Sequence, residues 1–119
     1  LDAGPNTRTW LHDDDRITTG VQAALRYALD NGASFAGDLV TTDWILGRRD
    51  DDHLYVIPSE LMPFLRAELN DENLTTNAAA AALERSNYLY RSTKQGRSIP
   101  KSINGTLTRV WRLNLAILD

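Results

Sequence analysis

Residues 88–113, YLYRSTKQGRSIPKSINGTLTRVWRL, constrain the fold more than any other stretch of the chain. Two strand-like runs, Tyr88–Tyr90 and Thr106–Leu113, flank a segment that contains glycine, proline and the pair Asn104-Gly105. These residue types break regular structure and favour turns. The pattern therefore predicts a β-hairpin whose two arms carry a long tip.

The same stretch is cationic in an otherwise acidic chain. It carries six basic residues and no acidic one, whereas residues 1–87 carry seven Arg and fifteen Asp or Glu, a net charge of −8. A solvated surface mixes both signs, so a segment of one sign indicates a surface that meets negative charge. Because phosphates are bound chiefly by Lys and Arg, the segment predicts a nucleic-acid partner. The alternative is an incidental basic loop.

Length and composition indicate one domain without a membrane segment. The chain has 119 residues, of which 42% are hydrophobic, enough for one compact core but not for two. No apolar run approaches the roughly 18 residues of a membrane span, and no signal peptide is evident, so we expect a cytoplasmic protein. The absence of cysteine excludes disulfides, cysteine-based zinc sites and a cysteine nucleophile. Because the first residue is Leu1, we expect a piece of a longer protein.

Periodicity divides the first half of the chain into a lead-in, a helix and a hairpin. We expect residues 1–17 to form a loosely packed lead-in and residues 18–119 to form the domain. Helical spacing of apolar residues predicts a helix that begins at Thr18 or Thr19 and ends at Asn31-Gly32. Two apolar runs around the polar residues 48–52 then predict a short first hairpin.

Two further helices precede the basic hairpin. The first opens at residues 58–60, although Pro63 leaves two alternatives: a start near Leu61, or a start at Ser59 with an irregular first turn. After a cluster of turn-forming residues at 70–73, a third helix begins at Thr75 or Thr76. This order predicts an α+β fold: a winged helix-turn-helix with three helices, a short first hairpin and a C-terminal hairpin as the wing.

In such a fold the start of the third helix can enter the major groove. Thr75, Thr76 and Asn77 are therefore candidate DNA contacts, because Asn pairs with adenine and Thr contacts bases or phosphates. The alternative is that the following alanines face the core and the threonines only cap the helix.

The hairpin supplies the remaining candidates. Its tip is expected to present to phosphates the side chains of Arg91, Lys94, Arg97 and Lys101. Strand alternation places Arg109 on the side of Trp111 and Leu113, which we expect in the core, so Arg112 is expected to point outward. Tyr88 and Tyr90 either stack on unpaired bases or belong to the core.

Catalytic and metal-binding patterns are weak. Acidic triplets at 13–15, beside His12, and at 50–52 have no spaced partner that completes a metal site, and solvated turns are the simpler interpretation. The sequence contains no GxxxxGK[ST] phosphate loop and no GxSxG elbow. We therefore expect a chain that is not itself an enzyme and needs no cofactor.

The segments DHLYVIPSELMPFLRAELN, ALERSNYLYRSTKQGR and TRVWRL resemble the C-terminal region of replicative helicases and helicase-like proteins of bacterial mobile elements. Ser86-Asn87-Tyr88 stands where that family typically has a tight Gly-aromatic turn. The resemblance implies a winged-helix tail that follows an ATPase absent from this chain. Its implied partners are DNA and the rest of the parent protein. The alternative function is a winged helix that docks on another domain or subunit.

Overall fold

The computed structural model describes residues 5–38, 42–92, 94 and 96–119, with side chains from residue 13 onward. The fold is α+β, as predicted, with three helices and one mixed sheet of five strands. The elements in chain order are α1 (Pro5–Asp30), β1 (Ser34–Ala36), β2 (Ile45–Arg49), β3 (His53–Val56), α2 (Pro58–Leu69), α3 (Thr76–Arg85), β4 (Ile99–Ile103), β5 (Thr106–Asn114) and the 3-10 helix η1 (Leu115–Leu118).

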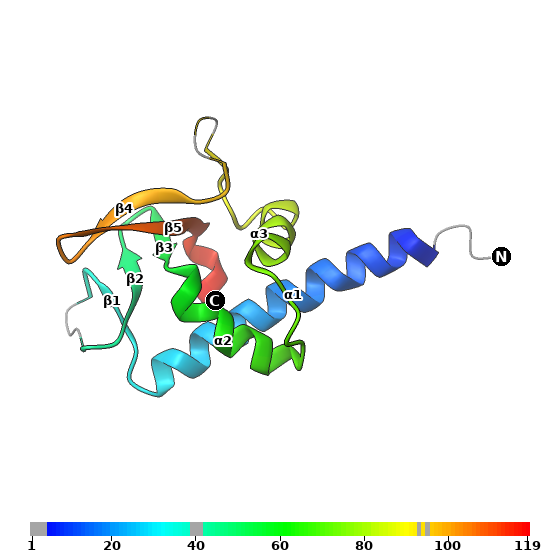
Figure 1. Cartoon of the computed structure of the whole chain (residues 1–119), viewed down its shortest axis with the longest axis horizontal. Coiled ribbons are helices and arrows are strands. Elements are labelled where there is room, and N and C mark those ends of the chain that lie inside the picture. The colour runs from blue at the N-terminus through cyan, green and yellow to red at the C-terminus, as the bar shows by residue number, and fades with distance from the viewer. Residues whose placement is uncertain (1–4, 39–41, 93, 95) are drawn as a thin grey trace.

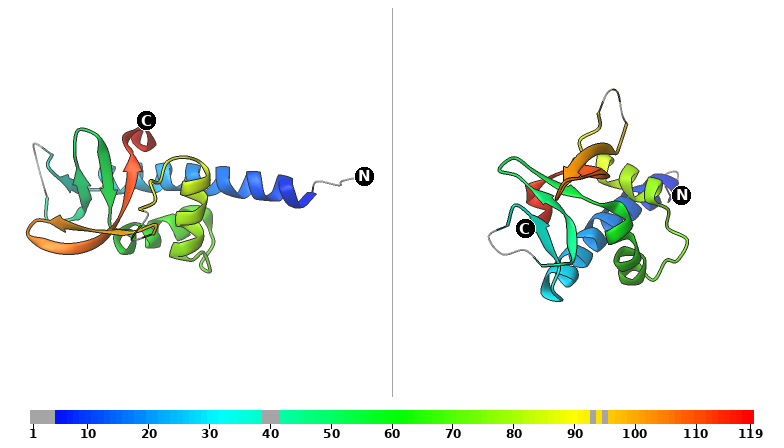
Figure 2. Two further views of the ribbon diagram at one scale, coloured as in Figure 1. Left: turned by 90° about the horizontal axis from the view of Figure 1, so that it is seen from above. Right: turned by 60° about the vertical axis from the view of Figure 1, so that its left-hand side comes forward.

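The strand order is β1-β2-β3-β5-β4, which is not a simple winged-helix pattern. Strand β1 pairs with β2 in parallel, and every other pairing is antiparallel. The sheet stands at one end of the molecule, while the first turns of α1 extend away from it at the other end (Figures 1 and 2). Strands β1 and β2 thus extend the outer edge of a smaller unit made of β3, β5 and β4.

Helix α1 begins at Pro5, so the expected start at Thr18 or Thr19 is wrong, and the helix crosses the expected boundary between residues 17 and 18. Proline is favoured in the first turn of a helix. The hydroxyl of Thr18 donates a hydrogen bond of 3.0 Å to Ser86 Oγ and does not cap a helix.

The α1 and α2 helices pack closely at Gly20. A Cβ built at Gly20 would lie 2.7 Å from Leu69 Cδ2, so a larger residue would require the side chain of Leu69 to move. The expected exit at Asn31-Gly32 is confirmed, because Gly32 has a φ of 105°. No helix in the described part of the chain is long and apolar enough to cross a membrane.

The first hairpin and the two following helices are confirmed. Strands β2 and β3 pair around residues 50–52, and α2 begins at Pro58 and keeps Pro63 within it. Asn70 caps the C-terminal end of α2 in the left-handed conformation, with a φ of 51°. Helix α3 follows a short turn, and its N-cap is Thr75.

The basic hairpin differs from the expected one in where it turns. Its tip is the two-residue turn Asn104-Gly105, with φ values of 51° and 86°, and β4 rather than Tyr88–Tyr90 forms its first arm. An Asn-Gly pair is favoured in a two-residue turn of this kind. Pro100 lies inside β4. Proline is tolerated there because β4 is an edge strand. The described residues between Arg85 and Ile99 form a separate connection from α3 to β4 and are not part of the hairpin.

Both faces of the sheet are covered by apolar residues. The main core lies between the sheet and the three helices and includes Trp111 and Leu113, as predicted. A smaller cluster on the other face contains Tyr55, Ile103 and Val110. Strand β5 therefore contributes alternate residues to two different surfaces.

Candidate nucleic-acid interface

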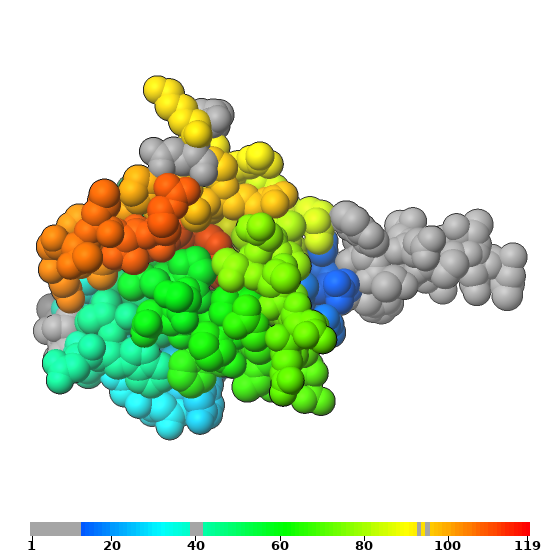
Figure 3. Space-filling view, in the orientation of Figure 1, coloured from blue at the N-terminus to red at the C-terminus, as the bar shows by residue number. Residues whose placement is uncertain are grey.

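A groove lies where the first turn of α3 meets the basic hairpin. Its volume is about 520 Å³, and it opens between α2, α3, β5 and the segment that leads into β4. The space-filling view shows the hairpin, in orange, lying beside α2 and α3, in green and yellow-green (Figure 3). The residues that line the groove are Pro58, Ser59, Thr76, Asn77, Ala80, Arg97, Ser98, Arg109 and Trp111.

Two ties to α1 fix the position of α3 beside this groove. The guanidinium of Arg85 donates two hydrogen bonds to the Asp14 carboxylate, from Nε at 2.8 Å and from a terminal nitrogen at 2.7 Å. One turn further along α1, Thr18 bonds Ser86. Hydrogen bonding with Asp14 raises the pKa of Arg85, which keeps its guanidinium charged.

The start of α3 is held by its own cap. The side chain of Thr75 accepts a hydrogen bond of 3.0 Å from the amide of Ala78, which leaves the hydroxyl engaged. Of the alanines that follow, Ala79, Ala80 and Ala82 are buried. The alternative in which the threonines cap the helix and the alanines face the core therefore describes Thr75 and most of the alanines. Asn77, in contrast, is exposed at the groove.

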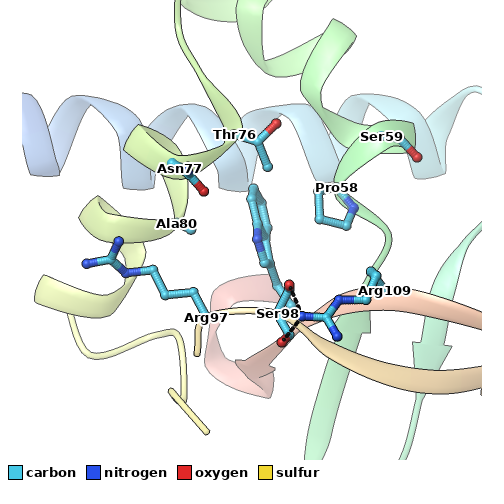
Figure 4. Close-up of a pocket in the computed structure, with 9 residues that line it drawn as sticks. Pro58, Ser59, Thr76, Asn77, Ala80, Arg97, Ser98 and Arg109 are labelled. Atoms are coloured by element: carbon cyan, nitrogen blue, oxygen red, sulfur yellow. Dashed lines mark hydrogen bonds between the residues drawn. The ribbon is translucent and has the colours of Figure 1, made fainter. Parts of the chain in front are cut away.

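Arg97 and Arg109 bring two positive charges to the groove, one from each side (Figure 4). Arg109 donates hydrogen bonds to the backbone oxygen of Ser98 at 2.9 Å and to its hydroxyl at 3.0 Å. Arg97 pairs with Glu84 on α3 at 3.3 Å. The groove thus combines two guanidinium groups with the polar side chains of Asn77 and neighbouring residues.

The structure brings only three of the eight candidate residues together at this groove: Thr76, Asn77 and Arg97. Lys94 lies on the connection between α3 and β4, as does Arg91, which lies 3.9 Å from Glu84. Lys101 and Arg112 lie on the face of the sheet that turns away from the helices. The groove and this face of the sheet are therefore two separate surfaces, and the candidates are divided between them and the connection.

Sequence reasoning set Arg109 aside, although it lines the groove. The signal was present, since alternation already placed Arg109 on the side of Trp111. The sequence did not indicate where the hairpin turns. The turn at Asn104-Gly105 sets the register between β4 and β5, which places Arg109 opposite Pro100 and next to Ser98.

Two acidic side chains from distant segments neutralise part of the positive charge. Glu84 pairs with Arg91 and Arg97, and Asp50 lies 3.7 Å from Lys101. Counting charges along residues 88–113 does not reveal these partners. The surface is consequently less positive than its sequence indicates.

Among the described residues, no three His, Cys, Asp or Glu side chains lie close enough to hold a metal ion. Asp14 is bound to Arg85, Asp50 contacts Arg48 at 3.2 Å, and the side chain of His12 lies outside the described residues. Comparison with protein-family models, with curated proteins and with solved structures found no match.

Proposed function

We propose that this chain is a winged-helix domain that binds DNA mainly through phosphate contacts. The observation that carries the proposal is the groove between the start of α3 and the basic hairpin, with Arg97 and Arg109 at its walls. The proposal extends to the parent protein, in which the domain serves as the C-terminal auxiliary part of a replication helicase or initiator of a mobile element. Any ATP hydrolysis belongs to that parent protein.

The order of the elements supports this assignment. Helices α2 and α3, joined by a short turn, match the helix-turn-helix order, and the β4–β5 hairpin comes after them in the chain, as a wing does. Strand β5 lies between β3 and β4, so the wing is anchored to the strand that precedes α2. Strands β1 and β2 are then an addition at the outer edge.

The groove chemistry favours phosphates over base edges. Guanidinium groups bind phosphate oxygens in a bidentate manner, and hydroxyl and amide side chains such as Thr76 and Asn77 add hydrogen bonds. The first turn of α3 offers Asn77 for adenine but no arginine fork for guanine. The proposed binding is therefore weakly sequence-specific.

Salt dependence of duplex binding tests the proposal. Each neutralised phosphate contributes about 0.9 to the slope of log K against log salt, so Arg97→Gln with Arg109→Gln should reduce the slope by about 2. Fluorescence anisotropy with a labelled duplex at several salt concentrations measures both affinity and slope. Arg26→Gln is the matched control, because Arg26 is exposed on α1 and does not line the groove.

We expect the double variant to bind at least about tenfold more weakly at low salt, whereas Arg26→Gln should change affinity little. Unchanged affinity and slope in the double variant would refute the assignment. Thermal unfolding of each variant establishes that a loss of binding is not a loss of folding.

A second candidate function, docking on another protein, is favoured by one observation. Tyr27 is 55% exposed and lies with Phe64 at an apolar depression of about 360 Å³ between α1 and α2. The ring centroids of these two residues are 5.9 Å apart. Complex formation with the parent ATPase in size-exclusion chromatography, sensitive to Tyr27→Arg, together with no binding to any nucleic acid, would select this function instead.

A further inference from the structure

The face of the sheet that turns away from the groove carries a cluster of aromatic and cationic side chains. His53 and Tyr90 meet edge to face, with ring centroids 5.1 Å apart and an interplanar angle of 87°. The guanidinium carbon of Arg112 lies 5.7 Å from the centroid of Tyr90. Tyr90 is nevertheless 39% exposed, so these neighbours leave a large part of it open to solvent. We call His53, Tyr90 and Arg112 the aromatic patch.

The position of the aromatic patch follows from the strand pairing. Arg112 lies opposite Tyr55 in the β3–β5 pairing, and Trp111, its neighbour in sequence, points into the core. The amide of Tyr90 donates a hydrogen bond of 2.9 Å to the carbonyl of Arg112, which fixes residue 90 beside the end of β5. Because successive residues of a strand point to opposite faces, the patch and the groove are separate surfaces.

Arg112 has neither a carboxylate partner nor a hydrogen-bond acceptor at its Nε among the described residues. Within the described part of the chain it forms no ion pair, and its Nε is buried without a hydrogen-bond partner. Lys101, further along this face, lies 4.4 Å above the ring of Tyr55. Unlike Arg112, it has a carboxylate neighbour in Asp50. The buried Nε is out of reach of a ligand, but an anion at the rest of the Arg112 guanidinium would meet no competing ion pair within the described part of the chain.

We propose that the aromatic patch binds single-stranded nucleic acid, with one base stacked on Tyr90 and the adjoining phosphate bound by Arg112. Exposed aromatic rings beside cations are the usual means of holding single strands, because every unpaired base offers a π-face. A duplex does not offer these faces, since its bases stack on one another. The inference rests on the proposed nucleic-acid binding and adds a second surface, whose ligand differs from that of the groove.

The test compares three ligands and a small set of variants by fluorescence anisotropy. The ligands are labelled oligo(dT) and oligo(rU) of about 16 nucleotides and a blunt duplex. Tyr90→Leu removes the stacking ring, Tyr90→Trp retains one, and Arg112→Gln removes the cation. Tyr27→Leu is the matched control, because it removes another exposed tyrosine that lies on α1.

We expect Tyr90→Leu to weaken oligo(dT) or oligo(rU) binding at least about fivefold, and Tyr90→Trp to retain it. Arg112→Gln should reduce the salt slope for single strands by about 0.7. Duplex binding should stay unchanged in these three variants, and Tyr27→Leu should bind single strands and duplex as the unsubstituted chain does. Equal loss for both oligonucleotides assigns the site to base and phosphate, and loss for one assigns it in addition to the 2′-hydroxyl of rU or the methyl group of dT.

Three results would overturn the inference. The first is a Tyr90→Leu variant that binds single strands as well as Tyr27→Leu does. The second is a parallel loss of duplex binding in Tyr90→Leu, and the third is single-strand binding that disappears only with Arg97→Gln and Arg109→Gln. If the duplex binds through the groove while Tyr90 has no effect, only this inference fails. If the unsubstituted chain binds none of the three ligands, the proposed function fails with it.

Discussion

The clamp between Asp14 and Arg85 is the tertiary interaction whose removal gives the sharpest test of this fold. Asp14 is 8% exposed, and both of its carboxylate oxygens accept hydrogen bonds from one guanidinium. Arg85→Ala leaves that carboxylate buried without its partner. Breaking a fully buried pair costs about 3–5 kcal/mol, whereas exposed pairs contribute about 0.2–1 kcal/mol. Because the Arg85 side chain is 38% exposed, water can reach the site, and we expect a loss of about 2 kcal/mol.

Urea unfolding followed by circular dichroism measures this loss as a lower midpoint with an unchanged slope. A double-mutant cycle with Asp14→Ala should give a coupling energy of about 1–2 kcal/mol. The matched control is Arg16→Ala, because Arg16 pairs with Asp13 at 3.0 Å on the exposed side of α1. That variant should lose less than about 0.5 kcal/mol.

The expected pH dependence has a definite sign. The pKa of Arg85 is raised by Asp14, so its contribution to stability is fully present below the ordinary arginine pKa and is lost only at strongly alkaline pH. The Arg85→Ala deficit should therefore persist from neutral to moderately alkaline pH. A deficit no larger than that of Arg16→Ala, or a coupling energy near zero, would refute the reasoning.

Three further substitutions test other parts of the structure. Gly47→Ala should unfold the domain or lower its melting temperature severely, because a Cβ there would lie 1.8 Å from the carbonyl oxygen of Tyr55; a wild-type melting curve would contradict the strand pairing. Thr75→Ala should cost about 1 kcal/mol in urea unfolding by removing the cap of α3, whereas Thr75→Ser should not. Glu84→Gln should strengthen duplex binding severalfold at low salt by releasing Arg97, and unchanged anisotropy would place the phosphates elsewhere.

Features set by neighbouring residues were predictable from the sequence. The cap at Thr75 and the left-handed exit at Gly32 each depend on residues within one turn of the chain. The apolar runs of β2 and β3 likewise predicted the first hairpin. The residues that determine such features are neighbours in the chain, so a single sequence is enough to predict them.

The position of α3 against α1 and the charge of the candidate surface depend on residues that are not neighbours in the sequence. Asp14 and Arg85 are separated by 71 positions, so no local pattern reveals that an acidic residue in a supposed lead-in anchors α3. The same holds for Glu84, whose neutralising effect on Arg97 appears only when α3 and the following segment lie side by side. The split of the candidate residues into two surfaces depends on the position of the hairpin turn, which the composition of the segment left open.

The hydrogen bonds between Arg109 and Ser98 have a consequence for the thermodynamics of ligand binding. A free arginine side chain gives up roughly 2 kcal/mol of rotamer entropy when a ligand immobilises it. Arg109 has lost part of this freedom during folding, because both the carbonyl and the hydroxyl of Ser98 hold it. The exposed side chain of Lys94 makes no such hydrogen bond within the described part of the chain, so a phosphate that it binds must also order this side chain. Contacts through Arg109 should therefore show a smaller entropic penalty in calorimetry than contacts through Lys94.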